Sequence, residues 1–180
     1  MNVSVIGAGP AGSYAAFLLA KQGHKVNVFE DHPAIGVPVQ CTGIVTHALW
    51  DLIPKESSII RTELSKVVVH GPHTQAIVPL HEFVLDRAKL DQYIAELAKK
   101  AGAKFHASHR FIRFEGKNVV VRHNSKEKSI PTDITIGADG PNSDVAKEAG
   151  IWTPRKCWGG IQATIQGQYD PKAFEVFFGD

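Results

Sequence analysis

Short apolar runs alternate with polar positions near the start of the chain, in a strand–helix–strand order. Residues 3–6 read Val-Ser-Val-Ile and lead directly into a glycine-rich turn, which is typical of a buried strand. An apolar stretch at 15–20 predicts the helix that follows, and Lys25–Phe29 predicts a second strand. This order predicts a βαβ unit whose two strands run parallel.

The strongest helix signal in the rest of the chain covers residues 87–100. Apolar residues recur there at helical spacing, lysines occupy the last turn, and Gly102 ends the pattern. Weaker signals predict a helical stretch at about 45–52 and a short helix at 143–150.

Apolar or alternating runs predict further short strands, most of them bounded by glycine or proline. The predicted strands cover residues 67–69, 75–79, 82–85, 104–106, 110–114, 118–122, 134–136, 160–165 and 174–178. We interpret the first three as an antiparallel insertion and the run at 104–106 as a parallel strand. The runs on either side of Glu115-Gly116-Lys117 are typical of a β-hairpin.

Three glycines follow the first strand in the pattern Gly7-x-Gly9-x-x-Gly12. In the dinucleotide-binding fingerprint the first glycine allows a sharp turn, the second lets a pyrophosphate approach the backbone, and the third lets the helix pack closely. The free N–H groups at the helix start then face the phosphates. The alternative is a turn that serves helix packing alone.

Glu30 closes the second predicted strand, near the position, about 20 residues beyond the glycines, where the fingerprint has an acidic residue. Its carboxylate would accept hydrogen bonds from the ribose hydroxyls of an adenosine and would repel a 2′-phosphate. We therefore expect an adenosine of the FAD or NAD type rather than NADP. A surface glutamate without this role is the alternative.

The composition narrows the class of protein. The chain has 180 residues, of which 43% are hydrophobic and 21% charged, and these values are ordinary for one soluble domain. Its net charge of +2 is too small for a nucleic-acid footprint, so we expect no nucleic-acid partner. No apolar run is long enough to span a membrane and no signal peptide precedes the first strand, so we expect a cytoplasmic protein.

Cysteines and histidines give no pattern typical of a metal site. The two cysteines lie far apart in the sequence, outside any CxxC arrangement, which fits a reducing compartment. His70 and His73, like His106 and His109, have HxxH spacing, but neither pair is predicted to lie on a helix face. We therefore expect no metal site.

A second glycine turn, Gly137-Ala138-Asp139-Gly140, follows the predicted strand at 134–136. This strand would deliver the Asp139 carboxylate to the carboxyl edge of the sheet, where open α/β sheets bind their ligands. Together with the first glycine motif and Glu30, it favours a flavin over a nicotinamide as the bound dinucleotide.

Four segments together carry a resemblance to a known family. They are Gly7–Gly12, Pro38-Val39-Gln40-Cys41-Thr42-Gly43, Val84-Leu85-Asp86-Arg87-Ala88-Lys89-Leu90-Asp91 and Gly137–Gly140. In this order and spacing, the sequence resembles the flavoprotein superfamily of para-hydroxybenzoate hydroxylase and, within it, the archaeal geranylgeranyl reductases. The first and last segments are shared across the superfamily, whereas the combination of the middle two is much narrower.

The resemblance implies a Rossmann-like α/β fold with a parallel central sheet and a β-hairpin or meander layer. Residues 1–150 would form an FAD-binding domain, with a substrate-side β insertion at about 59–85. Residues 151–180 would begin an antiparallel, β-rich substrate domain that is truncated here. Since the family continues well past this length, the chain resembles its N-terminal portion.

The resemblance also assigns the cofactor and its contacts. The residues that it implies for FAD are Gly7, Gly9, Ala11, Gly12, Glu30, Cys41, Thr42, Gly43, Arg87, Phe111, Asp139 and Gly140. The glycine loop would hold the pyrophosphate, Glu30 the adenosine ribose and Arg87 the phosphate or ribityl side, and the backbone of Phe111 would meet the adenine. Many relatives have glycine at the position of Thr42, so close backbone approach to the flavin would rest on Gly43.

The family's activity implies an FAD-dependent oxidoreductase that saturates double bonds of a prenylated lipid or a prenyl diphosphate. A hydride from reduced flavin must be matched by a proton on the other carbon. Cys41 is the candidate catalytic donor because a thiol is protonated at neutral pH, and a small loop-shaping residue is its alternative role. The electron donor stays open between a nicotinamide and a ferredoxin-type protein, and peripheral membrane contact is expected from the substrate alone.

Two other hypotheses stay open from the sequence. A flavin-dependent monooxygenase or halogenase of the same superfamily would share the first and last segments, although Cys41-Thr42-Gly43 argues against it. The other is a catalytically incomplete FAD-binding fragment, because the sequence lacks the family's further Gly-Asp flavin motif.

Overall fold

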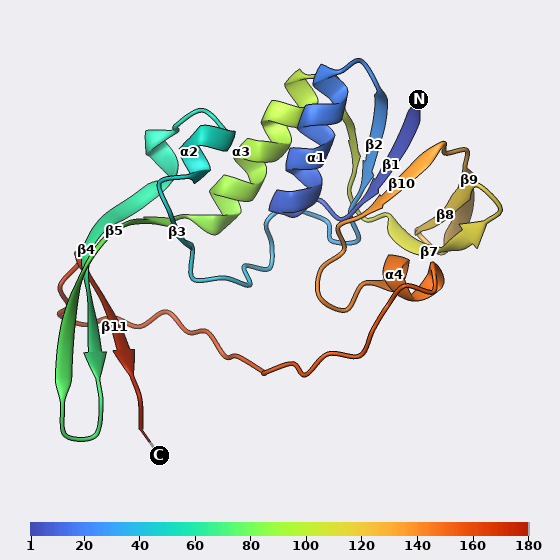
Figure 1. The fold of residues 1–180 in the computed structure, drawn as a ribbon. Helices are drawn as coiled ribbons and strands as arrows, with labels where there is room; N and C mark the ends of the chain where they lie inside the picture. Colours follow the sequence, from blue (N-terminus) through green and yellow to red (C-terminus); the bar gives the residue numbers. More distant parts are fainter. Residues whose placement is uncertain (180) are drawn as a thin grey trace. The chain divides into compact units, whose positions relative to one another are not determined.

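The computed structural model describes residues 1–179, which form two compact units (Figure 1). Residues 1–39 and 90–158 make up the first unit, and residues 40–89 and 159–179 make up the second. In chain order the elements are β1 (Asn2–Ile6), α1 (Pro10–Lys21), β2 (Lys25–Phe29), β3 (Ile44–Val45), α2 (Leu49–Leu52), a 3₁₀ turn (Ser57–Ile59), β4 (Ile60–His70), β5 (Gln75–Leu85), α3 (Arg87–Lys100), β6 (Lys104–His106), β7 (Arg110–Glu115), β8 (Asn118–His123), β9 (Lys126–Ile130), β10 (Ile134–Gly137), α4 (Asp144–Glu148) and β11 (Ala173–Phe177).

A parallel sheet in the order β10-β1-β2-β6 forms the centre of the first unit. β1 and β2 pair in register over their whole length, so both strands end at the same edge of the sheet. α1 and α3 lie side by side along one face (Figure 1). The core on that face joins small helix residues to strand valines: Ala16, Ala20, Ala98, Val3, Val5, Val26 and Val28.

The opposite face of this sheet is covered by the antiparallel meander β7-β8-β9. Ile6 and Phe29 are the strand neighbours of Val5 and Val28, so their side chains point to the other side of the sheet. There they pack in a second buried cluster with Phe111, Val119, Val121 and Val145. The glycine loop and the end of β2 thus lie at the carboxyl edge of a sheet that is packed on both faces.

The second unit contains a sheet in the order β11-β4-β5-β3. β4 and β5 form a long antiparallel hairpin, β3 adds antiparallel to β5, and β11 adds parallel to β4. The segment before β11 is fixed to β4, because Thr62 Oγ1 donates a hydrogen bond to the carbonyl of Pro171 and Lys66 pairs with Asp170 at 2.8 Å.

The α/β class, the parallel sheet and the meander layer predicted from the sequence are confirmed. The helix predicted at 87–100 is α3, and the strand predicted at 104–106 is β6. The runs at 75–79 and 82–85 are instead one strand, β5, which continues through Pro79. Pro79 pairs with Lys66 beside a register shift, where a missing N–H donor is tolerated.

The structure differs from the sequence analysis in four further ways. No strand forms at 160–165, where Ile161 and Ile165 are exposed, and the predicted helix at 45–52 shortens to α2 because β3 takes Ile44–Val45. β9 was not predicted because its sequence, Lys-Glu-Lys-Ser-Ile, is mostly charged and exposed. The second sheet is mixed rather than antiparallel, since β11 runs parallel to β4.

The domain boundary at residue 150 stays a prediction. Across residues 1–179, the helices are all too short or too polar to cross a membrane.

Candidate functional site

Close backbone packing explains two of the three glycines in the loop between β1 and α1. Gly7 has a φ of +99°, and a Cβ at this position would collide with the carbonyl group of Ala138. A Cβ on Gly12 would collide with the carbonyl oxygen of Gly7 and would lie 3.1 Å from the Ala138 Cβ. The fold itself therefore requires both glycines.

Nothing in the described protein requires a glycine at the middle position, Gly9. Its φ of −67° is open to any residue, and no atom of the described chain lies within 4 Å of the place a Cβ would take. Gly9 is the N-cap of α1 and is followed by Pro10. Within residues 1–179 no side chain caps this helix start, and its first turn, which includes the exposed Ala11, has no acidic residue. The loop thus presents free N–H groups and the positive end of the helix dipole to open space, which suits a phosphate.

Glu30 holds the glycine loop from the end of β2. One carboxylate oxygen accepts a hydrogen bond from the Ala8 amide at 2.7 Å, and the other accepts from the His32 amide at 3.0 Å and contacts the His32 ring at 2.6 Å. Burial raises the pKa of Glu30, but these hydrogen bonds outweigh it, so the pKa lies below its ordinary value. Glu30 is therefore a carboxylate at neutral pH, aimed at the loop.

Asp31 and His32 extend this carboxylate into a small polar cluster. His32 Nδ1 lies 2.9 Å from an Asp31 oxygen, and the hydrogen bond to Glu30 raises the pKa of His32. Burial and the Glu30 carboxylate raise the pKa of Asp31. Glu30, Asp31 and His32 are the one group of three possible metal ligands among the described residues. We interpret the group as a hydrogen-bonded cluster, because the His32 nitrogen nearest both carboxylates is already engaged by them.

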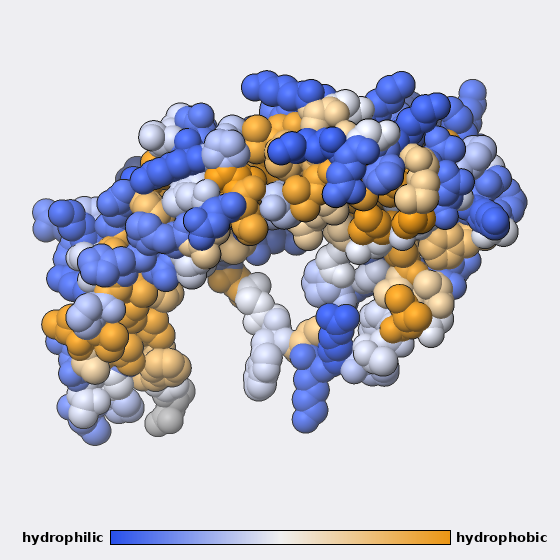
Figure 2. Space-filling view, turned by 45° about the horizontal axis from the view of Figure 1, so that its top comes forward, coloured by the Kyte–Doolittle hydropathy of each residue, from blue (hydrophilic) through white to orange (hydrophobic). Residues whose placement is uncertain are grey.

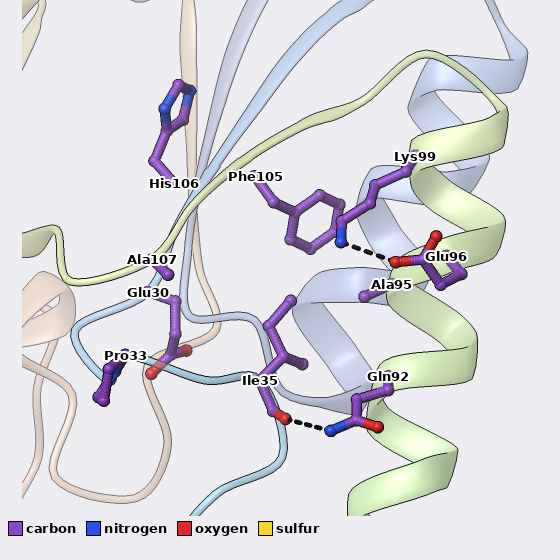
Figure 3. Close-up of a pocket in the computed structure, with 10 residues that line it drawn as sticks. All are labelled: Glu30, Pro33, Ile35, Gln92, Ala95, Glu96, Lys99, Phe105, His106 and Ala107. Carbon is purple, nitrogen blue, oxygen red and sulfur yellow. Dashed lines mark hydrogen bonds and ion pairs between the residues drawn. The ribbon is translucent and has the colours of Figure 1, made fainter.

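A pocket of about 290 Å³ lies on the α3 side of Glu30 (Figure 3). Figure 3 shows that its walls come from the loop after β2, from α3 between Gln92 and Lys99, and from β6 with the residue after it. Its lining residues are Glu30, Pro33, Ile35, Gln92, Ala95, Glu96, Lys99, Phe105, His106 and Ala107. Gln92 connects α3 to the loop, because its side-chain amide donates a hydrogen bond to the Ile35 carbonyl. Lys99 forms an ion pair with Glu96 at 2.7 Å, and its ammonium group lies over the Phe105 ring.

Asp139 and Gly140 follow β10 at the same sheet edge, but the Asp139 carboxylate has partners within the protein. It accepts hydrogen bonds from Ser143 Oγ at 2.6 Å and from the Val145 amide at 3.0 Å, which fixes the start of α4. Gly140 has a φ of +82°, a conformation that glycine adopts without strain.

Phe111 belongs to β7 and is buried in the second core cluster, between the parallel sheet and the meander. A register shift separates Phe111 from Arg113, so the β7 backbone is irregular beside it. The ligand contacts of Phe111, Asp139 and Gly140 stay predictions.

The remaining predicted site residues lie in the second unit, where the two narrow family segments meet. The Gly43 carbonyl accepts a hydrogen bond from the Leu85 amide at 2.9 Å, and β3 starts directly after Gly43 to pair with β5. A Cβ on Gly43 would collide with the Leu85 carbonyl and lie 3.2 Å from Arg87 Cγ. Gly43 is therefore required by contact with the segment that carries Arg87.

Cys41 and Thr42 are exposed in the loop before β3. Cys41 Sγ accepts a weak hydrogen bond from the Gly43 amide at 3.5 Å. Asp86 precedes Arg87, caps α3 by accepting from the Lys89 amide at 3.2 Å, and pairs with Arg61.

The HxxH pairs do not converge on shared acidic partners in the described chain. His70 contacts Glu175, whereas His106 bonds Asn27 and His109 bonds the carbonyl of Ala107. Burial lowers the pKa of His106, and the neighbouring His109 lowers it further.

Several residues of the site were not predicted from the sequence. The Ala8 amide had no signal, since any residue supplies an N–H group. Gln92, Lys99 and Phe105 are spread over a helix and a strand, so no linear spacing marks the pocket that they line. From the sequence, His32 could lie near the adenosine ribose, with a solvated loop histidine as the favoured alternative, and its hydrogen bonds to Glu30 were not predicted.

Comparisons with known proteins agree with this arrangement. The family of NAD(P)-binding Rossmann-like domains matches residues 5–44. An uncharacterized protein in the nifH2 5′ region of Methanosarcina barkeri is 35% identical over 163 residues, which cover 83% of this chain and 88% of that protein. Digeranylgeranylglycerophospholipid reductase 1 of Methanopyrus kandleri is 31% identical over 98% of this chain and 50% of its own length.

A solved structure matches over nearly the whole chain. It is that of a geranylgeranyl bacteriochlorophyll reductase-like protein from Thermoplasma acidophilum, with 26% sequence identity and a TM-score of 0.80. The match covers 99% of this chain and 50% of that one. The chain thus spans about half the length of the Methanopyrus reductase and of the solved protein.

Proposed function

The chain belongs to the geranylgeranyl reductase family of flavin-dependent oxidoreductases, and we propose that it forms the FAD-binding part of an enzyme that saturates prenyl double bonds. The substrate class comes from the relatives' names, which specify a digeranylgeranylglycerophospholipid and a geranylgeranyl bacteriochlorophyll. For this chain we propose a prenyl chain on a lipid or a lipid precursor.

The residues of the first unit fit an adenine-containing dinucleotide. Gly9 leaves space in front of an uncapped helix start, which suits a pyrophosphate. Glu30 is ionised beside this loop, and the carboxylate oxygen that accepts from the Ala8 amide has a second lone pair with which to accept from a ribose hydroxyl. The carboxylate would repel a 2′-phosphate, which favours FAD over NADP.

The proposal is carried mainly by Gly9. Gly7 and Gly12 are explained by packing inside the protein, whereas Gly9 is explained neither by its backbone angles nor by a neighbouring atom. A glycine that the described fold does not need fits a ligand that approaches the backbone closely.

Bound and reduced, FAD would supply a hydride to one carbon of the alkene. The other carbon needs a proton, and we propose that the exposed thiol of Cys41 provides it. Arg87 is always charged and would contact the cofactor's phosphate or ribityl side. Gly43 would keep the Arg87 segment in place, because it packs against that segment without a Cβ.

An anaerobic assay tests the proposal. Purified chain would be loaded with FAD, reduced with dithionite and mixed with digeranylgeranylglycerophospholipid, and the product would be analysed by mass spectrometry. We expect a gain of two hydrogens for each reduced double bond. Cys41→Ser should slow this gain, whereas Cys157→Ser, which changes the other exposed thiol, should leave it unchanged.

Other results would select the competing hypotheses. Oxygen-dependent addition of an oxygen atom, with no saturation, would favour a monooxygenase. FAD binding with neither product would mean that this chain is catalytically incomplete.

A further inference from the structure

His32 makes the two oxygens of the Glu30 carboxylate unequal. Within residues 1–179, Oε2 accepts one hydrogen bond, from the Ala8 amide at 2.7 Å. The other oxygen, Oε1, accepts from the His32 amide at 3.0 Å and lies 2.6 Å from Nδ1 of the same residue. Because Glu30 is ionised and its oxygens can only accept, Nδ1 carries the hydrogen. Each carboxylate oxygen has about two lone-pair positions, so Oε1 is filled and Oε2 has one position open.

The backbone around His32 keeps its ring in this place. The Glu30 carbonyl accepts a hydrogen bond from the His109 amide at 2.7 Å. The His32 carbonyl accepts another from the Ser108 amide at 3.0 Å. Pro33 follows, and a proline restricts the backbone of the residue before it. The segment from Glu30 to His32 is therefore fixed on both sides of Asp31, and the contact of the ring with Oε1 belongs to a fixed arrangement.

The charged groups around the ring favour the same hydrogen bond. An Asp31 oxygen lies 2.9 Å from His32 Nδ1, so the hydrogen on Nδ1 lies between two carboxylates. Arg110, at the start of β7, favours the charged form of Asp31 and forms an ion pair with Asp144 at 3.4 Å. Since two carboxylates attract a donor, Nδ1 keeps its hydrogen and Oε1 stays occupied.

The ring lies on a polar part of the first unit. The side chains of His32, Asp31 and Arg110 are 44%, 50% and 64% exposed. Hydrophobic residues gather instead over the β4–β5 hairpin of the second unit, at the lower left of Figure 2. A ligand with hydroxyl groups therefore suits the open position on Oε2 better than an apolar one does.

We propose that His32 restricts Glu30 to one ribose hydroxyl of the adenosine, because its ring occupies the oxygen that would otherwise accept the second. A carboxylate offers two oxygens, and a ribose presents two neighbouring hydroxyls, 2′ and 3′. In this protein His32 supplies the donor for Oε1, and the ribose supplies one donor for Oε2. This inference rests on the proposed function, since it takes the ligand to be the adenosine end of FAD.

Adenosine diphosphates that lack one hydroxyl test this arrangement. ADP, 2′-deoxy-ADP and 3′-deoxy-ADP would be titrated into the purified full chain by isothermal titration calorimetry at constant pH. With the unmodified chain, one deoxy analogue should bind at least ~10-fold more weakly than ADP, because a hydrogen bond to a carboxylate is lost. The other analogue should stay within ~3-fold of ADP, because its missing hydroxyl has no place on Glu30.

Substitution of His32 should change this pattern. His32→Ala opens a lone pair of Oε1 to the second hydroxyl, so both deoxy analogues should bind at least ~10-fold more weakly than ADP. His32→Asn places an amide N–H near the position of Nδ1 and should restore the preference of the unmodified chain. A purely structural role of the ring would not produce this rescue.

His24→Ala is the matched control. His24 lies directly before β2, at the end of the strand opposite to Glu30, and its substitution should keep the pattern of the unmodified chain. Circular dichroism checks that the variants fold. If His32→Ala is unfolded, His32→Leu, which also lacks a donor, takes its place.

Three results would overturn this inference and leave the proposed function intact. The first is equal binding of the two deoxy analogues by the unmodified chain. The second is a His32→Ala variant that keeps the pattern of the unmodified chain, and the third is a His32→Asn variant that behaves like His32→Ala. Failure of the unmodified chain to bind both ADP and FAD would overturn the proposed function, and this inference with it.

Discussion

The carboxylate of Glu30 accepts a hydrogen bond from the backbone amide of Ala8 at 2.7 Å, so the end of β2 holds the glycine loop that follows β1. β1 and β2 are neighbouring parallel strands that end at the same edge, which is why a residue after one can reach the loop after the other. The acidic residue of the fingerprint therefore shapes the loop, and its contact with a ribose is part of the proposed function.

Replacing glycines of the loop should separate ligand binding from folding. Gly12→Ala is expected to lower the free energy of unfolding by about 3 kcal/mol, because the new Cβ collides with the Gly7 carbonyl. Gly9→Ala meets no atom and should cost within about 1 kcal/mol, yet it should weaken FAD binding at least ~10-fold. Urea unfolding and flavin fluorescence titration measure the two effects. Unchanged FAD affinity in Gly9→Ala would contradict the role of the open position.

Glu30→Gln should destabilise the fold in a pH-dependent way. The folded-state pKa of Glu30 lies below its ordinary value, so the carboxylate stabilises the protein at neutral pH. This contribution is lost as the pH falls from about 4.3 through the lower folded-state pKa. We expect a loss of about 1–3 kcal/mol at pH 7 that shrinks below about pH 4.

Glu96→Gln is the control for this measurement. Glu96 is an exposed acid in an ion pair with Lys99, and its loss should change stability by less than about 0.5 kcal/mol. Urea unfolding across the pH range provides the comparison. A Glu30→Gln effect of the same size at acidic and neutral pH would show that the charge is not what stabilises the loop.

Two histidines of the first unit should titrate in a defined order. The hydrogen bond to Glu30 raises the pKa of His32, whereas burial and nearby positive charges lower that of His106. The stabilisation from His32 is present below pH ~6.5 and is lost as the pH rises through its higher folded-state pKa. His106 has the opposite pH dependence. Because its folded-state pKa is lowered, its effect is to make the folded protein less stable as the pH falls below ~6.5.

NMR titration of the imidazole signals measures this order directly. His32 should titrate above His106, and Glu30→Gln should lower the His32 midpoint while leaving that of His106 in place. A His106 midpoint above that of His32 would be inconsistent with the described burial.

The contact between the two narrow family segments can be tested with a matched pair of glycines. Gly23 and Gly43 have nearly equal backbone angles, with φ of +82° and +85°, but only Gly43 is packed against other atoms. Gly23→Ala should cost about 1 kcal/mol from the backbone alone. Gly43→Ala should cost about 1–3 kcal/mol more, because its Cβ collides with the Leu85 carbonyl. Equal losses of stability for the two variants in thermal unfolding would mean that the segment carrying Arg87 moves to accommodate the new Cβ without an energetic penalty.

The sequence predicted the first βαβ unit well because its signals are local. Strand, glycine turn and helix lie within one short segment, and each residue's conformation is set by its immediate neighbours. The sequence did not show which of these residues are needed for packing inside the protein. Gly9 and Gly12 look equivalent in the sequence, yet only Gly12 is needed for contact inside the protein.

Features that depend on pairing with another strand were not predictable in the same way. β9 is mostly charged, and it is a strand only because β8 offers a partner. The meeting of Gly43 with the Arg87 segment depends on β3 pairing with β5. The pocket beside Glu30 combines a loop, a helix and a strand, so no single stretch of sequence describes it.

The central claim is that the glycine loop and Glu30 bind the adenosine diphosphate end of a flavin. Titration of the purified full chain with FAD and with FMN, which has the same ring system but no adenosine, tests it most directly. The account predicts that FAD binds at least ~10-fold more tightly than FMN and that Glu30→Gln removes most of this difference. Equal affinity for the two flavins, or no binding of FAD, would contradict it.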